Sequence, residues 1–427
     1  MKNNIAVIIL AAGKSTRMKS ETPKVLHNLC GRPMLGYVLD LVASLRPKQV
    51  VAVLGFKQEL VRKIIPKGVK IAIQKKLIGT ADAVKTGLAT LRSFKGNVLV
   101  LCGDVPLLKK ETLKNLLDYH IKNNVDLTLL TTQLKKPSGY GRIMRDKYFS
   151  ICGIVEEKDA DEVQKDIKEI NTGIMVLKKE SLTGNLKYIR PNNRKNEYYL
   201  TDIIGILAKK DYLVDGVKVE DAQEALGINT HVELAKANSL MKERINEKFM
   251  QEGVTILDPA STFINFGAAI GVDTVIYPFT VIERDVRIGK RCSVGPFAHL
   301  REGVELKDDV TAGNFIEMVR AKIGAKTLVK HFSYIGDSSV GSCVNIGAGT
   351  VTANFDGLRK NNTVIKDKVN IGSDTIIVAP VEIGRSAVTG AGSVITKNIP
   401  DNAVAVGVPA RILRKNLPTG RQGGRHG

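Results

Sequence analysis

The sequence has no tryptophan, and aromatic side chains make up only 5% of its 427 residues. Stacking platforms for single-stranded nucleic acid are built from aromatic rings, so this composition argues against such a function. The formal net charge is +21, yet no run of five or more basic residues forms a nucleic-acid-binding tail. We therefore expect no nucleic-acid partner. The positive charge suits anionic small molecules, and a polyanion-binding scaffold is the weakest alternative.

Cysteine and long apolar segments are also scarce. The five cysteines are odd in number, far apart and never spaced as C-x-x-C, which is typical of reduced thiols in the cytoplasm. The apolar run near the start, Ile5 to Ala12, is too short to span a membrane, and no signal-peptide cleavage site follows it. We expect a cytoplasmic protein without a membrane partner.

The first half of the chain alternates apolar runs with amphipathic stretches. The runs at 5–12, 50–54, 70–74 and 97–102 predict buried strands, and the stretches at 35–45 and 111–120 predict helices. This alternation is typical of a doubly wound, Rossmann-like α/β sheet, in which ligands bind beyond the carboxyl ends of the strands. That rule places residues 13–18 and 103–106 at one site.

Past Pro259 the pattern changes to small aliphatic residues at every sixth position, often followed by glycine. The fifteen positions are Ile264, Ile270, Ile276, Ile282, Ile288, Val294, Leu300, Leu306, Ala312, Met318, Ile371, Ile377, Ile383, Thr389 and Ile395. A period of six predicts a parallel β-helix, whose coils bury one aliphatic side chain per face. The register breaks near Ile323 and again at 353–362, where we expect a loop that lines the binding face.

The domain organisation follows from these patterns. We predict an α/β domain at 1–229, a linker helix at 230–252, a β-helix domain at 253–415 and a disordered tail at 416–427. The linker has an apolar stripe at helical spacing, and either Asn229 or Thr230 is suited to cap its start.

A glycine turn follows the first predicted strand, in the stretch LAAGKSTRM at 10–18, and Pro23-Lys24 comes shortly after it. Backbone N–H groups of such a turn can hold a phosphate, and Arg17 and Lys24 would neutralise triphosphate charge. From these residues alone, a structural turn with solvated Lys and Arg side chains fits about equally well.

The wider set of motifs resembles a known family. The glycine turn followed by Pro-Lys is similar to sugar-phosphate nucleotidylyltransferases. The further motifs are Gln74, Gly79-Thr80, Cys102-Gly103-Asp104, Gly139 to Arg142, Val155 to Lys158, Glu169 to Gly173, Glu197 to Asp202, Gly227 to Asn229, His331 to Asp337 and Asn345 to Thr350. In this order they resemble the bifunctional N-acetylglucosamine-1-phosphate uridylyltransferase and glucosamine-1-phosphate acetyltransferase of bacterial cell-wall precursor synthesis, over residues 5 to about 411.

The resemblance implies a function and a set of residue roles for the first domain. UMP would pass from UTP to N-acetylglucosamine 1-phosphate with release of pyrophosphate, and Arg17 and Lys24 would be the catalytic cations. Asp104 and Asn229 would hold Mg²⁺, whose preferred ligands are oxygen atoms. The nucleotide and sugar contacts would be Leu10, Ala11, Ala12, Gly13, Lys24, Gln74, Gly79, Thr80, Cys102, Gly103, Asp104, Gly141, Glu156, Asn171 and Asn229.

For the second domain the resemblance implies a left-handed β-helix, a homotrimer, and acetyl transfer from acetyl-CoA to glucosamine 1-phosphate. His331 would be the general base. Arg301, Tyr334 and Asn345 would hold the sugar phosphate, and Ala348, Asn354, Phe355, Ser373 and Ala391 would line the acetyl-CoA groove.

The chain departs from the family pattern at three positions in this domain. Val319 and Val408 replace basic residues, and Phe355 lacks an expected hydroxyl; Arg320 and Arg411 are the candidates to compensate for the lost charges. These departures leave open a uridylyltransferase whose β-helix is only structural.

Overall fold

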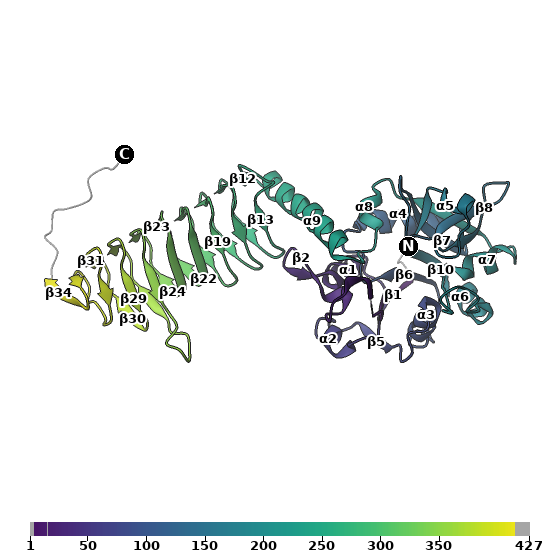
Figure 1. Ribbon diagram of the computed structural model, residues 1–427, viewed down its shortest axis with the longest axis horizontal. Helices are drawn as coiled ribbons and strands as arrows, with labels where there is room; N and C mark the ends of the chain where they lie inside the picture. The colour runs from purple at the N-terminus through teal and green to yellow at the C-terminus, as the bar shows by residue number, and fades with distance from the viewer. Residues whose placement is uncertain (1–3, 15, 415–427) are drawn as a thin grey trace. The chain divides into compact units, whose positions relative to one another are not determined.

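The computed structural model describes residues 4–14 and 16–414, which form two compact units (Figure 1). The boundary between the units falls between Ala237 and Asn238, inside helix α9 (His231–Gln251), the segment predicted to link the domains. The predicted tail at 416–427 lies outside the described residues. No helix among those described combines the length and the apolar character needed to cross a membrane.

The first unit is built on a twisted sheet whose main path runs β11-β7-β10-β6-β1-β4-β5. The strands on this path are β1 (Ile5–Ala11), β4 (Gln49–Leu54), β5 (Lys70–Ile73), β6 (Asn97–Cys102), β7 (Leu127–Gln133), β10 (Glu169–Lys178) and β11 (Val214–Lys218). β1 lies between β4 and β6 and is parallel to both, so the carboxyl ends of the three strands lie side by side at one edge of the sheet. The four strands predicted from apolar runs are confirmed to within one residue at each end.

One strand on the main path of this sheet runs against the others on that path. β10 is antiparallel to both β6 and β7, and it also pairs with the hairpin of β8 (Arg142–Arg145) and β9 (Ile151–Val155). Antiparallel neighbours can be joined by a short connection, whereas parallel neighbours need a long crossover. The alternation of strands and helices predicts the Rossmann-like sheet, but it carries no sign of this reversed strand.

Helices cover both faces of the sheet and create two separate apolar cores. Successive residues of β1 point to opposite faces, so Val7 and Ile9 belong to one core, and Ala6 and Ile8 to the other. The first core is covered by α1 (Met34–Ser44), α2 (Gln58–Arg62), α4 (Lys110–Lys122) and α8 (Ala222–Ala225). The second is covered by α3 (Thr80–Leu88), α6 (Lys179–Asn185) and α7 (Asp202–Ala208).

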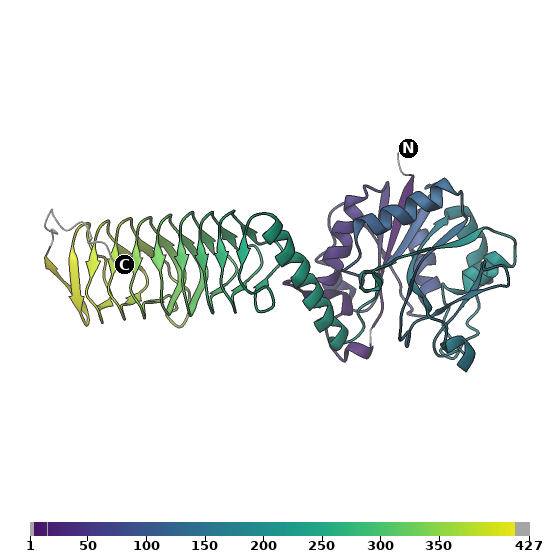
Figure 2. The same ribbon diagram turned by 90° about the horizontal axis from the view of Figure 1, so that it is seen from above.

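The second unit is the predicted left-handed parallel β-helix, in which short strands follow one another coil by coil (Figures 1 and 2). One column contains β12 (Thr255–Ile256), β15 (Val275–Ile276), β18 (Ser293–Val294), β21 (Thr311–Ala312), β23 (Leu328–Val329), β25 (Asn345–Ile346), β28 (Asn370–Ile371), β31 (Val388–Thr389), β33 (Val404–Gly407) and β34 (Ala410–Arg414). A second contains β13 (Phe263–Ile264), β16 (Val281–Ile282), β19 (His299–Leu300), β22 (Ile316–Ile323), β24 (Ser333–Val340), β26 (Val351–Ala353), β29 (Ile376–Val378) and β32 (Val394–Ile395). A third contains β14 (Ala269–Ile270), β17 (Arg287–Ile288), β20 (Glu305–Leu306), β27 (Thr363–Ile365) and β30 (Val381–Ile383), joined to the second by the long β22 and β24.

The six-residue period is explained by this architecture. Val281 pairs with His299, three periods further along the chain, so one coil carries three aliphatic positions. Of the fifteen predicted positions, all except Ile270 are buried, and Ile270 is partly buried against the same core. Both register breaks are present: Glu305 pairs with Lys322, one residue short of a full coil, and a loop at 354–362 separates β26 from β27.

Candidate functional site

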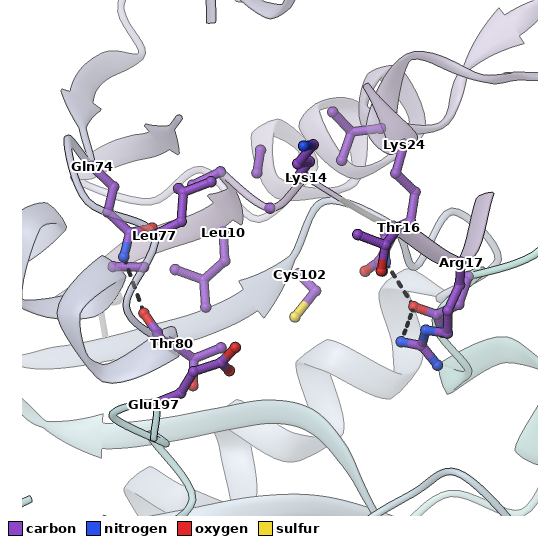
Figure 3. A pocket seen from close by; sticks show the side chains of 18 of the residues that line it. Leu10, Lys14, Thr16, Arg17, Lys24, Gln74, Leu77, Thr80, Cys102 and Glu197 are labelled. Carbon is purple, nitrogen blue, oxygen red and sulfur yellow. Dashed lines mark hydrogen bonds and ion pairs between the residues drawn. The ribbon is translucent and has the colours of Figure 1, made fainter. Parts of the chain in front are cut away.

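A cavity of about 480 Å³ lies at the carboxyl ends of β1 and β6. Eleven of the fifteen predicted nucleotide and sugar contacts line it: Leu10, Ala11, Ala12, Gly13, Lys24, Gln74, Gly79, Thr80, Cys102, Asp104 and Asn229. Figure 3 shows Gln74, Thr80 and Glu197 on one side of it, Lys24 and Arg17 on the other, and Leu10 and Cys102 between them. A Cβ atom at Gly13 would meet no protein atom within 4 Å, so this glycine leaves open space beside the strand end.

One end of the cavity is built around Gln74, which directly follows β5. Its side-chain Nε2 donates to the carbonyl of Gly79 (3.1 Å) and to Asp82 Oδ2 (3.0 Å), and only 5% of the residue is exposed. Thr80 Oγ1 accepts a hydrogen bond from the N–H of Leu200 (2.9 Å). These bonds fix a rigid, partly polar wall at this end of the cavity.

Gly79 is required for this wall by its conformation and its surroundings. Its φ is +131°, and a Cβ atom there would lie 2.3 Å from the carbonyl oxygen of Tyr198. We expect Gly79→Ala to displace the segment around Tyr198 and to lower the free energy of unfolding by about 1–3 kcal/mol, the usual cost of such backbone strain. Chemical denaturation measures the loss. Gly184→Ala, where the added Cβ meets no atom within 4 Å, is the matched control; an equal effect there would contradict the prediction.

At the other end, the predicted metal ligands and cations meet. Lys24 Nζ forms an ion pair with Asp104 Oδ2 and donates to Asn229 Oδ1 (2.8 Å), and Arg17 Nη2 donates to the same Asn229 oxygen (2.8 Å). The N–H of Ile228 bonds the carbonyl of Asp104 (3.0 Å), which holds the two loops together. The four residues therefore form one polar cluster that only the fold brings together.

This cluster fits a divalent cation. The Lys24 ammonium contacts an oxygen of Asp104 and an oxygen of Asn229, so both oxygens already face a positive charge. The second carboxylate oxygen of Asp104, Oδ1, is buried and has no hydrogen-bond partner among the described residues, and a hard cation prefers such oxygen ligands. Among the described residues, no group of three or more His, Cys, Asp or Glu side chains is placed to hold a metal ion.

A second cavity of about 290 Å³ adjoins the first and shares with it Arg17, Cys102, Asp104 and Asn229. The predicted sugar contacts Gly141, Glu156 and Asn171 line this second cavity. The two cavities thus meet at the metal-binding candidates, an arrangement that suits transfer between two ligands.

Hydrogen bonds and burial shape the second cavity. The N–H of Asn171 donates to the carbonyl of Gly141 (2.9 Å), and Thr201 Oγ1 donates to Glu156 Oε1 (3.1 Å). Burial raises the pKa of the Glu156 carboxyl above its ordinary value, and burial together with Glu156 raises that of Asp202 to about 6. The pKa values of these two neighbouring acids, of which Glu156 lines the cavity, are thus both shifted upward.

Some residues differ from the sequence expectation for this site. Gly103 does not line either cavity; its N–H continues the strand pairing by bonding the carbonyl of Leu10 (2.9 Å). Lys195 and Glu233 line the cavities, and the sequence analysis assigned them no role. For Glu233 a signal exists, because Thr230 followed by an acid three positions later is the pattern of a capping box. No local pattern marks Lys195.

In the second unit, one edge of the β-helix carries His331 beside a row of aromatic rings. Phe279, Phe297 and Phe315 stack with centroids 4.9 and 5.0 Å apart and ring planes within 5°. Phe332 follows on the next coil, and all four rings are about half exposed. His331 is itself exposed at the start of this coil. This set, Phe279, Phe297, Phe315 and Phe332, is called the aromatic edge below.

Three of the five predicted acetyl-CoA contacts, Ala348, Ser373 and Ala391, continue along the same edge, on the coils after Phe332. The N–H of Asp374 bonds the carbonyl of Ala348 (2.6 Å), and the N–H of Gly392 bonds that of Ser373 (2.8 Å). Ala348, Ser373 and Ala391 therefore occupy equivalent positions on successive coils and lie in one column.

The three predicted sugar-phosphate contacts divide between two columns. Arg301 follows β19 and donates to Glu317 Oε1 (2.9 Å), and Glu317 lies opposite Tyr334 in the pairing of β22 with β24. Asn345 belongs to β25 in the other column, where its Nδ2 donates to Asn370 Oδ1 (2.9 Å). A site that uses all three must form around the edge between these columns.

Arg320, the residue predicted to compensate for the cation missing at Val319, lies in an ion pair with Asp337. Val319 is buried, and both Arg320 nitrogens Nε and Nη2 contact the carboxylate of Asp337 (2.8 Å for Nη2). The same carboxylate accepts a hydrogen bond from the side chain of Asn354, and the Arg320 guanidinium holds the pKa of Asp337 below its usual value. Arg320 therefore orders the start of the 354–362 loop, and its charge is already paired.

The other two departures lie at exposed positions. Phe355 opens the loop with its ring 60% exposed, next to Asp356, whose pKa falls to about 2 because backbone N–H groups and Asn361 bond its carboxylate. Val408 is 72% exposed beyond β33, and Arg411 lies in β34, opposite Val406. The loop is thus ordered by its own hydrogen bonds and presents an aromatic ring outward.

Comparison with known proteins was made for the whole chain. The family of MobA-like NTP transferase domains matches residues 7–155. The "Bifunctional protein GlmU" of Thermosipho africanus is 43% identical, over 98% of this chain and 98% of that protein. The proteins of the same name from Thermosipho melanesiensis and from a Geobacillus species are 41% and 40% identical, each over 96% of both chains.

Proposed function

Because the chain belongs to the family of bifunctional GlmU proteins, we propose that its first unit transfers UMP from UTP to N-acetylglucosamine 1-phosphate and its second acetylates glucosamine 1-phosphate. The chain is an enzyme with nucleotidyltransferase and acetyltransferase activity, as its relatives indicate. They do not favour a uridylyltransferase with a purely structural β-helix, nor does any of them point to a polyanion-binding scaffold.

The observation that carries the first assignment is the meeting of two cavities at Asp104 and Asn229. The larger would hold UTP, with its base near Gln74 and its phosphates near Lys24 and Arg17. The smaller would hold the acetylated sugar. The sugar phosphate would then face the α-phosphate of UTP at the point where the cavities join.

The chemistry needs no protein nucleophile, since a phosphate oxygen of the sugar is already anionic. It attacks the α-phosphorus of UTP, a P–O bond forms, and the bond to pyrophosphate breaks. Lys24 and Arg17 offset the charge that develops on the transferred group and on the leaving pyrophosphate. Asp104 and Asn229 would hold Mg²⁺, which would supply further stabilisation of the phosphate charge. On binding of these ligands we expect Lys24 to leave Asp104 for a phosphate oxygen.

In the second unit, His331 would take a proton from the sugar amine as the nitrogen attacks the thioester carbonyl of acetyl-CoA. The C–N bond forms, the C–S bond breaks, and coenzyme A leaves as the thiol. The exposed position of His331, on the edge that also carries Ala348, Ser373 and Ala391, supports this role.

A homotrimer is the proposed assembly, and the aromatic edge supports it. Stacked rings left about half exposed are a surface that a second copy of the chain would cover. The sugar-phosphate contacts also lie on two columns around this edge, where neighbouring chains would complete a groove.

We expect Phe297→Asn, which places a polar side chain in the middle of the stack, to shift the assembly toward monomers. Size-exclusion chromatography with light scattering gives the mass. Phe263→Asn is the matched control, because Phe263 is similarly exposed but outside the stack. A trimer that survives the first change, or dissociates equally with the second, would contradict this arrangement.

The uridylyl reaction is tested by supplying UTP, Mg²⁺ and N-acetylglucosamine 1-phosphate and following pyrophosphate. Release that depends on the sugar phosphate and on Mg²⁺ is the expected result. Its absence with correctly folded protein would overturn the assignment.

A further inference from the structure

The turn before helix α9 holds Asn229 by a reciprocal set of hydrogen bonds. Glu233 Oε2 accepts from the N–H of Asn229 (2.6 Å) and from the N–H of Thr230 (3.1 Å). Thr230 Oγ1 in turn accepts from the N–H of Glu233 (3.1 Å), and the carbonyl of Thr230 accepts the first helical bond, from Leu234. Thr230 is therefore the N-cap, and Glu233 closes a capping box that extends one residue back to Asn229.

The side chain of Asn229 has one orientation that satisfies its neighbours. Its Nδ2 donates to the carbonyl of Gly227 (2.9 Å), a group that can only accept. Its Oδ1 receives hydrogen bonds from Lys24 and Arg17, which can only donate. The amide oxygen therefore points to Asp104 and the junction of the cavities, provided that the backbone of Asn229 stays in place.

Glu233 is the group that fixes this backbone from the helix side. One carboxylate oxygen of Glu233 accepts hydrogen bonds from two successive N–H groups. Loss of this side chain would therefore remove a restraint on the backbone of the turn that carries Asn229. Glu233 also lines the smaller cavity, but the hydrogen bonds that it makes are directed to the turn. Its influence on the reaction thus passes through Asn229.

We propose that Glu233 is a positioning residue for the metal ligand Asn229, so that the capping box of α9 sets the affinity of the uridylyl-transfer site for its divalent cation. This inference rests on the proposed function of the first unit. Residues that orient a metal ligand typically change metal affinity or activity by ten- to a hundredfold when they are removed. The negative charge of Glu233 is not needed, because the amide oxygen of Gln can accept the same two hydrogen bonds.

The test compares Glu233→Ala, Glu233→Gln and the control Glu243→Ala, an exposed acid on the same helix. For each we measure the Mg²⁺ concentration that gives half-maximal pyrophosphate release. Binding of Mn²⁺ in the presence of a non-hydrolysable UTP analogue, followed by electron paramagnetic resonance, gives a readout that does not depend on turnover. For Glu233→Ala we expect both metal affinities to fall about ten- to a hundredfold. Glu233→Gln and Glu243→Ala should stay close to the wild type.

Each other outcome overturns the inference. If Glu233→Ala binds the metal as tightly as the wild type, Glu233 does not position Asn229. If Glu233→Gln loses as much metal affinity as Glu233→Ala, the effect comes from the negative charge of Glu233 and not from its hydrogen bonds. If Glu233→Ala does not fold, Thr230→Val, which removes the acceptor for the Glu233 N–H, must lower metal affinity in the same direction. A wild-type protein that neither binds Mn²⁺ with the analogue nor releases pyrophosphate would refute the proposed function itself.

Discussion

Asp104→Asn is expected to reduce kcat/KM for uridylyl transfer about a hundred- to a thousandfold, the range measured when one preorganised electrostatic contact is removed. The substitution keeps the shape of the side chain, and an amide oxygen can still accept from Lys24. It removes the negative charge and leaves an amide in the place of Asp104 Oδ1, the buried oxygen with no partner among the described residues. Pyrophosphate release under saturating Mg²⁺ measures the effect.

Acetyl transfer by the same Asp104→Asn protein is the internal control. The second unit has its own hydrophobic core, so its activity and the unfolding of the protein should change little. Retention of uridylyl transfer within about threefold of the wild type would mean that Asp104 does not hold the metal, since a lost electrostatic contact costs far more.

His331→Ala should produce the reverse pattern. Removal of a general base typically lowers the rate by about a hundred- to ten-thousandfold, and we expect this loss in the release of thiol from acetyl-CoA with glucosamine 1-phosphate. The side chain is exposed, so the free energy of unfolding should hardly change. Uridylyl transfer should be unaffected.

The pH profile separates a base from a binding contact in the case of His331. If the group takes a proton during the reaction, the residual activity of His331→Ala loses the acidic limb of the wild-type profile. Acetyl transfer at the wild-type rate in this variant would exclude His331 as the base and would direct the search to other groups of the same edge.

The β-helix was predictable because its signal is local. Each coil needs a small aliphatic residue at every sixth position, and the buried residues from Ile264 to Ile395 show this spacing. The reversed direction of β10 was not predictable, because a strand buried on both faces has the same composition in either direction. The direction of β10 is seen in its antiparallel pairing with β6, β7 and β8, and these pairings are known only once the strands are placed.

Part of the functional site could likewise be predicted from the sequence, and part could not. The stretches at 13–18 and 103–106, which follow predicted strands, could be placed at one site from the rule for α/β sheets, whereas Gly79 and Thr80 could be assigned only through the family resemblance. The ammonium of Lys24 between Asp104 and Asn229 could not be predicted, because three distant segments create that contact. The pairing of Arg320 with Asp337 likewise could not be predicted, because it depends on the register of β22 with β24.

The central claim is that one chain carries both reactions in sequence. The direct test supplies glucosamine 1-phosphate, acetyl-CoA, UTP and Mg²⁺ together and follows the products by mass spectrometry. We predict UDP-N-acetylglucosamine, with one coenzyme A thiol and one pyrophosphate released for each molecule formed. Thiol release without the nucleotide sugar, or no product from either reaction, would contradict the account.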